Sequence, residues 1–140
     1  MSVLIRGRLA GTAVTLVHGP SGAEITTVPP VDNGGDGSRF SPTDLCAASL
    51  GACASTILGL YAVRNGIAVE GVEFTVEKEM SGAPRRIGRL TLTMRIRTDC
   101  SEKDFERLVA AARACPVRLT LGDGVEVVEG YERVGAGVPA

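Results

Sequence analysis

Cysteines are the residues of this sequence best suited to do chemistry, and there are four of them, Cys46, Cys53, Cys100 and Cys115. A deprotonated cysteine is a nucleophile, a metal ligand and a target of oxidation. His18 is the only histidine of the 140-residue chain and no Cys-x-x-Cys pair occurs, so we expect no metal and no other cofactor. The N-terminus lacks the apolar run of a signal peptide, which predicts a cytoplasmic protein with free thiols.

Cys53 is placed in the middle of a predicted helix, seven residues after Cys46 and so on nearly the same helix face. The helix N-terminus is too far away to stabilise a thiolate there, so an activated Cys53 would need a cation from another segment. Arg39, in the loop before the helix, could supply it because arginine stays charged when it is desolvated. The alternative is a structural role, since cysteine is a common small apolar residue in protein cores.

Cys115 follows Leu108 by seven residues, on the core side of a second predicted helix, and directly precedes Pro116. Proline is favoured at the first position of a helix, so Cys115 is expected at the N-cap of a short third helix. The free amides and the dipole at that end would lower its pKa, which predicts that Cys115 is the more acidic thiol. A cysteine that merely ends a helix is the alternative, and Cys100 is expected to be incidental.

Turn residues and hydrophobic periodicity predict the elements that must position these thiols. A meander of three strands is expected over residues 3–9, 13–17 and 23–28. A loop over 29–40 follows, rich in turn-forming residues. Ser41 as N-cap, Pro42 at the first helical position and Asp44 in the first turn then predict the start of a long helix.

The second half of the sequence predicts a hairpin, two helices and a final strand. Strands over 71–80 and 89–97 alternate apolar residues with charged and polar ones, which places glutamates near arginines in an ordinary cross-strand charge ladder. Ser101 and Asp104 predict the N-terminus of the second helix. A strand over 125–134 completes a single domain over 1–134, and we expect a flexible tail over 135–140.

Residues 45–63 form an uncharged run of nineteen residues, long enough to raise the question of a membrane span. Much of the run is Ala, Gly, Ser, Thr and Cys, and its surroundings alternate as in a soluble sheet, so we expect no membrane association. A helix that is apolar on all sides is buried on all sides. Small residues recur every four positions and would let another helix approach, at Ala47, Gly51, Ser55 and Gly59. We expect a homodimer with this helix near the interface, dense packing within a monomer being the alternative.

Composition limits the possible functions. Fifteen basic residues nearly balance sixteen acidic ones, and aromatic residues are 4% of the chain. A nucleic-acid partner is therefore not expected, because both a positive field and stacking platforms are lacking.

Two segments together resemble the OsmC/Ohr family, named for osmotically inducible protein C and organic hydroperoxide resistance protein. They are the helix entry SPTDLCAASLGACASTIL and the later ACPVRLTL, with 62 positions from Cys53 to Cys115. The resemblance implies an α+β intertwined homodimer in which antiparallel sheets enclose the long central helices. It also implies a thiol peroxidase: Cys53 attacks an organic hydroperoxide, Cys115 resolves the sulfenic acid as a disulfide, and a dithiol reductant restores both thiols.

One departure from the family pattern concerns the residues that would activate the thiol. The family glutamate that partners the activating arginine corresponds here to Thr43, and the nearest acid is Asp44. We expect Arg39 to activate Cys53 and Asp44 to orient Arg39, an arrangement that looks more like the less-characterised OsmC-like branch. The alternative is a non-catalytic dimer that binds a small apolar or electrophilic molecule, or that senses oxidants through its thiols.

Overall fold

The computed structural model describes residues 1–137, and residues 138–140 lie outside the described part. The chain divides into two compact units, Met1–Cys46 and Ala47–Ala140, each with its own sheet. The predicted tail over 135–140 is partly outside the described residues. In its described part, the backbone N–H groups of Ala136 and Gly137 donate to Asp99 and Glu70 at 3.0 and 2.9 Å.

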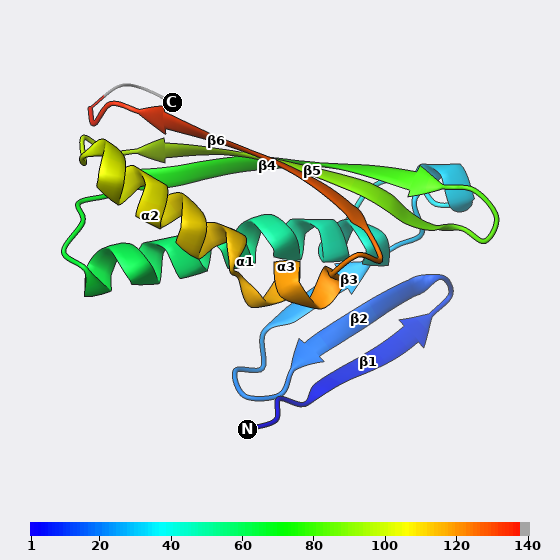
Figure 1. Ribbon diagram of the computed structural model, residues 1–140. Helices are drawn as coiled ribbons and strands as arrows, with labels where there is room; N and C mark the ends of the chain where they lie inside the picture. Colours follow the sequence, from blue (N-terminus) through cyan, green and yellow to red (C-terminus); the bar gives the residue numbers. More distant parts are fainter. Residues whose placement is uncertain (138–140) are drawn as a thin grey trace. The chain divides into compact units, whose positions relative to one another are not determined.

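The N-terminal unit contains the predicted meander. Strands β1 (Ile5–Ala10), β2 (Ala13–His18) and β3 (Glu24–Thr27) pair antiparallel in the order β1-β2-β3 (Figure 1). Gly11, with a φ of +63°, makes the tight turn between β1 and β2. The predicted loop contains one short 3-10 helix, η1 (Val31–Asn33).

Helix α1 (Pro42–Arg64) begins where its sequence predicts. The Ser41 side chain accepts the Asp44 backbone N–H at 3.1 Å, and the Asp44 carboxylate accepts the Ser41 backbone N–H at 2.8 Å. This reciprocal pair is a capping box with aspartate as the acid. At the other end, Gly66 has a φ of +63° and the Ile67 N–H donates to the Ala62 carbonyl at 2.9 Å, so the helix ends in a Schellman motif.

The C-terminal unit is a three-stranded sheet with helices on one face (Figure 1). Strands β4 (Gly71–Ser81) and β5 (Arg86–Arg97) form the predicted antiparallel hairpin. Strand β6 (Glu126–Val134) pairs with β5 in parallel, so this sheet is mixed, not purely antiparallel. The reason is the connection: α2 (Glu102–Arg113) and α3 (Pro116–Leu121) carry the chain back to the starting end of β5.

The core of the C-terminal unit lies between this sheet and the helices. Leu50 and Leu58 of α1 and Leu108 of α2 pack with a row of inward-facing β5 side chains, which are Leu90, Leu92, Met94 and Ile96. By length and composition α1 could also cross a membrane, and a third of its most apolar window is buried. Its core contacts account for one side of the helix, whereas Leu60 and Val63 on the other side are exposed.

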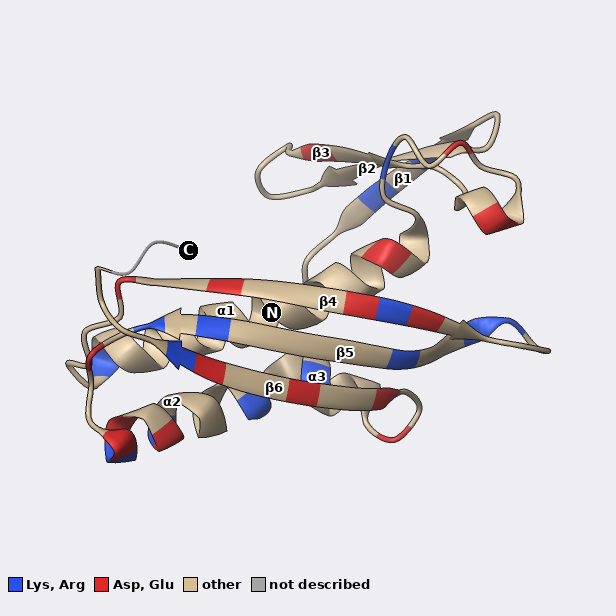
Figure 2. Cartoon of the chain, turned by 90° about the horizontal axis from the view of Figure 1, so that it is seen from above, with Lys and Arg blue, Asp and Glu red and all other residues tan. Residues whose placement is uncertain are grey.

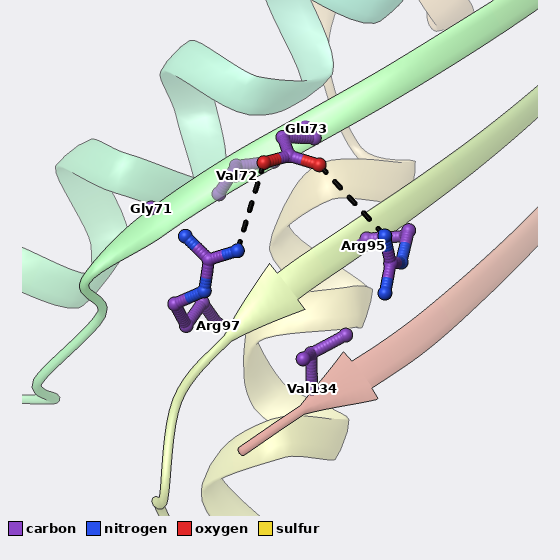
Figure 3. A pocket seen from close by; sticks show the side chains of 6 residues that line it. All are labelled: Gly71, Val72, Glu73, Arg95, Arg97 and Val134. Atoms are coloured by element: carbon purple, nitrogen blue, oxygen red, sulfur yellow. Dashed lines mark ion pairs between the residues drawn. The ribbon is translucent and has the colours of Figure 1, made fainter. Parts of the chain in front are cut away.

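Charged residues cover the opposite face of the sheet, where the basic residues of β5 run between the mainly acidic strands β4 and β6 (Figure 2). Arg89 reaches Glu79 and Glu126 at 3.5 and 2.9 Å. Arg95 and Arg97 both approach Glu73, at 3.9 and 3.7 Å, beside a small cavity of about 130 Å³ (Figure 3). The predicted charge ladder is confirmed, and its exposed pairs contribute a few tenths of a kcal/mol up to about 1 kcal/mol each.

Candidate functional site

The fold brings together two thiols that are far apart in the sequence. Cys53 lies in the middle of α1 and Cys115 lies between α2 and α3. Both are free thiols, and Cys53 packs against the core that contains Cys115, close enough to raise the pKa of the Cys115 thiol. Cys115 is fully buried, whereas Cys53 is partly exposed. A partly exposed thiol therefore lies next to a protected one.

Local sequence places Cys115. Its backbone is extended, and Pro116 occupies the first turn of α3, as predicted from the Cys-Pro pair. The Arg118 backbone N–H donates to the Cys115 sulfur at 3.4 Å, so the sulfur serves as the N-cap acceptor of α3.

The prediction that Cys115 is an acidic thiol is wrong. Burial raises its pKa, and the neighbouring Cys53 and Glu129 raise it further, while the Arg118 N–H acts in the opposite direction. One N–H donor at a six-residue helix does not offset the cost of placing a thiolate in the core. Cys115 is therefore held as a neutral thiol at neutral pH.

Sequence reasoning missed a polar network beside Cys115. Arg118 Nε lies 3.7 Å from Glu129 Oε2, and the Tyr131 hydroxyl donates to Glu129 Oε1 at 3.1 Å. The Arg113 guanidinium carbon lies 5.3 Å from the centre of the Tyr131 ring. Burial, then Glu129, raises the pKa of Tyr131, so this phenol stays protonated and donates. The sequence does contain a feature that could have revealed this network. Side chains in a strand alternate between its two faces, so Glu129 of β6 must lie on the same face as Val127 and Tyr131.

Arg39 and Asp44 belong to the N-terminal unit, whereas both thiols belong to the C-terminal unit. Arg39 lines an open hollow of about 720 Å³ with Phe40, Ile25 and residues around them. It also contributes to lowering the pKa of Asp36, after the hydrogen bonds from Ser38. The Asp44 carboxylate caps α1, as described above. Their predicted roles at Cys53 remain predictions.

The other two cysteines have different surroundings. Cys46 is half-buried one turn into α1, seven residues before Cys53. Cys100 follows β5, and its backbone N–H donates to Thr98 Oγ1 at 3.1 Å. Within residues 1–137, no group of three or more His, Cys, Asp or Glu side chains is arranged to hold a metal ion.

Comparisons with known proteins identify the fold. The family model for OsmC-like proteins matches residues 35–129. A Psychrobacter arcticus 273-4 protein, named for osmotic stress induction and detoxification response, is 30% identical, with a TM-score of 0.85 over 91% of this chain and 94% of its own. No curated protein sequence matches this one.

Two further crystal structures show the same fold at lower identity. The organic hydroperoxide resistance protein OsmC of Legionella pneumophila is 22% identical, with a TM-score of 0.76 over 94% of this chain and 97% of its own. The organic hydroperoxide resistance protein OhrB of Bacillus subtilis is 21% identical, with a TM-score of 0.66 over 94% and 98%. The expected α+β fold is thus confirmed, and the chain belongs to the OsmC-like protein family.

Proposed function

We propose that this protein is a cytoplasmic thiol peroxidase that reduces organic hydroperoxides, with Cys53 as the attacking and Cys115 as the resolving cysteine. The observation that carries the proposal is the contact between these two free thiols, one partly exposed and one buried. Family membership and the names of the Legionella and Bacillus proteins, which concern organic hydroperoxide resistance, support a stress-related redox role.

The proposed reaction needs two thiols and no cofactor. The Cys53 thiolate attacks one oxygen of the peroxide, an S–O bond forms, the O–O bond breaks, and the alkoxide leaves as the alcohol after taking a proton. The Cys115 thiol then displaces hydroxide from the Cys53 sulfenic acid, giving a disulfide and water. A dithiol reductant returns both sulfurs to thiols and itself becomes a disulfide.

Two charged residues of the N-terminal unit are assigned to Cys53 in this proposal. Arg39 supplies the positive charge that stabilises the thiolate and the departing alkoxide. Asp44 orients Arg39 in place of the family glutamate, which is Thr43 in this chain. Arg39, before α1, and Asp44, in its first turn, would thus serve a cysteine about three turns into that helix.

Turnover with different peroxides tests the activity. We expect cumene hydroperoxide to be consumed faster than hydrogen peroxide when a lipoyl dithiol is the reductant. After one equivalent of peroxide, peptide mass spectrometry should find a disulfide between Cys53 and Cys115 and none that involves Cys100. Absence of the Cys53–Cys115 disulfide would remove the resolving role of Cys115.

The position of the family glutamate favours a second candidate function, a non-catalytic dimer that binds a small apolar or electrophilic molecule or senses oxidants. The Thr43 hydroxyl lies 3.1 Å from the Ser41 hydroxyl, and the Asp44 carboxylate is bound to the Ser41 N–H. Both side chains thus serve the start of α1. Stoichiometric loss of thiols without catalytic turnover would support this candidate over the peroxidase.

We also propose that the protein is a homodimer, because large apolar side chains stay exposed in the single chain. On α1 these are Leu60 and Val63, 44% and 82% exposed, and on β1 they are Ile5 and Leu9, 62% and 66% exposed. Apolar surface of this kind commonly marks an interface between chains.

Sedimentation should therefore give twice the chain mass of 14.5 kDa. A Leu60→Asp substitution should weaken dimerisation by about a hundredfold or more, since it would bury an unpaired carboxylate. Val128→Asp is a matched control, because Val128 is similarly exposed, at 43%, but lies on β6. A wild-type chain that sediments as a monomer at micromolar concentration would contradict the dimer.

A further inference from the structure

We propose that Glu129 is a positioning residue for the thiol pair: its carboxylate, fixed by Arg118 and Tyr131, stabilises the neutral thiol of Cys115 and leaves Cys53 as the sulfur that reacts first. The order of reaction rests on the proposed function. The effect of Glu129 on the Cys115 thiol does not, because it can be measured without any peroxide.

The position of the Glu129 carboxylate is well defined. Its side chain is only 13% exposed, although it lies on a strand whose neighbouring glutamates are more than half exposed. One carboxylate oxygen accepts the Tyr131 hydroxyl at 3.1 Å and the other lies 3.7 Å from Arg118 Nε. A carboxylate with partners on both oxygens is held in place, and its partner Arg118 is also the residue whose backbone N–H binds the Cys115 sulfur at 3.4 Å, so the negative charge is fixed on the Cys115 side of the pair.

The elements around Cys115 contribute one acidic side chain, two basic ones and several neutral ones. Helix α1 contributes the Cys53 thiol, α3 contributes Arg118, and β5 contributes apolar side chains to the same core. From α2, Arg113 stacks on the Tyr131 ring. From β6, Glu129 is the anion, and it acts on Cys115 in the same direction as burial. Since Coulomb energy falls with distance and rises in a low dielectric, a carboxylate this buried disfavours a second negative charge beside it.

The Arg118 side chain has the opposite sign and so opposes Glu129. Its guanidinium neutralises part of the carboxylate charge, while its backbone N–H holds the Cys115 sulfur independently of the side chain. Removing the Glu129 charge should therefore lower the pKa of the Cys115 thiol, and removing the Arg118 side-chain charge should raise it. Loss of packing alone would not produce such a reversal.

The neutral form of Cys115 suits its proposed role. When Cys53 attacks the peroxide, a neutral neighbour adds no repulsion to the developing alkoxide. In the resolving step, the Cys115 proton leaves with the hydroxide of the Cys53 sulfenic acid as water, so the S–S bond forms without a net change of charge. A Cys115 that was already a thiolate would compete with Cys53 for the peroxide.

The experiment follows the ionisation of Cys115 across pH in the full reduced chain, from the NMR chemical shift of each assigned cysteine ¹³Cβ, because the buried sulfur is closed to an alkylating reagent. The ¹³Cβ shift differs between thiol and thiolate, so the pH midpoint reports the pKa. We expect the Glu129→Gln midpoint to fall by a few tenths of a unit, roughly a two- to threefold rise in thiolate at a given pH, and the Arg118→Gln midpoint to rise.

Matched controls come from an ion pair on the opposite face of the same sheet. Arg95 Nε lies 3.5 Å from Glu132, so Glu132→Gln and Arg95→Gln remove equivalent charges away from the thiols. Neither should move the Cys115 midpoint. Equal midpoints in wild type and Glu129→Gln, or a shift of the same sign in Glu129→Gln and Arg118→Gln, would overturn the proposal.

A second measurement separates this proposal from the proposed function. One equivalent of cumene hydroperoxide is added with a sulfenic-acid trap, and trapped Cys53 and Cys115 are quantified. In Glu129→Gln the share trapped on Cys115 should rise above that of wild type. If the midpoint shifts as expected but neither a trapped sulfenic acid nor a Cys53–Cys115 disulfide is found, the peroxidase function fails while the role of Glu129 stands. If the midpoint is the same in wild type and Glu129→Gln but sulfenic acid is trapped normally on Cys53, the role of Glu129 fails while the peroxidase function stands.

Discussion

Replacing Cys53 with serine is expected to lower the rate of hydroperoxide reduction by about a thousandfold or more. The reason is that a serine hydroxyl in the middle of a helix has no base to activate it, whereas a thiolate is itself the nucleophile. The rate is measured in the steady state with cumene hydroperoxide and a lipoyl dithiol.

A serine at Cys46 is the matched control for this substitution. Cys46 lies on the same helix and on nearly the same face as Cys53, and it is also half-buried. Cys46→Ser should keep the wild-type rate within a factor of about two or three. Cys115→Ser should still complete one turnover but then accumulate overoxidised Cys53, because the resolving thiol is absent. If Cys53→Ser consumed hydroperoxide as fast as wild type, Cys53 would not be the attacking cysteine.

The substitution Gly51→Ala should lower the free energy of unfolding by about 1–3 kcal/mol. A Cβ atom at Gly51 would lie 2.2 Å from the Phe74 ring, which packs over this position from β4. The ring would have to move, and the gain of up to about 1 kcal/mol from alanine in a helix offsets only part of that cost. Chemical denaturation followed by circular dichroism measures the difference.

Gly59→Ala provides the comparison on the same helix. Among residues 1–137 of the single chain, a Cβ atom at Gly59 would meet nothing within 4 Å. This variant should therefore gain about 0.4–1 kcal/mol, because alanine restricts the unfolded chain more than glycine does. If Gly51→Ala were as stable as Gly59→Ala, the Phe74 ring would not be tightly held against α1.

The same comparison shows where the sequence prediction of a small-residue stripe was incomplete. Ala47, Gly51, Ser55 and Gly59 do recur on α1, as the sequence indicates. The residue that uses the gap at Gly51 is an aromatic side chain from a strand of the same chain, and not a second helix. Periodicity shows that close approach is possible at a position, but not which element makes the approach.

Local features could be predicted from the sequence because their causes are a few residues apart. The start of α1 depends on Ser41 and Asp44, which are three positions apart and bind each other's backbone N–H. The N-cap at Cys115 likewise follows from the proline after it. In both cases the residues that fix the start of the helix all lie within one short segment, so they can be recognised without knowing the rest of the fold.

Features that depend on distant segments could not be predicted in the same way. The raised pKa of Cys115 arises first from burial, which the Cys-Pro pair does not encode. The contact between Glu129 and Arg118 requires that β6 return beside α3, and the parallel pairing of β6 with β5 requires the whole helical connection. The residue types of β6 indicate a strand, but they do not distinguish parallel from antiparallel pairing.

The parallel pairing of β5 with β6 also affects how quickly the chain can fold. Arg89 and Glu126 meet across this pair although they are 37 residues apart, whereas the β4–β5 hairpin closes over a short turn. Pairing that must close a long loop gains its contacts only after that loop entropy has been lost. We therefore expect the hairpin to form early and β6 to join last, with α2 and α3 already in place. Because β6 carries Glu129 and Tyr131, the surroundings of Cys115 would be completed only in the final step of folding.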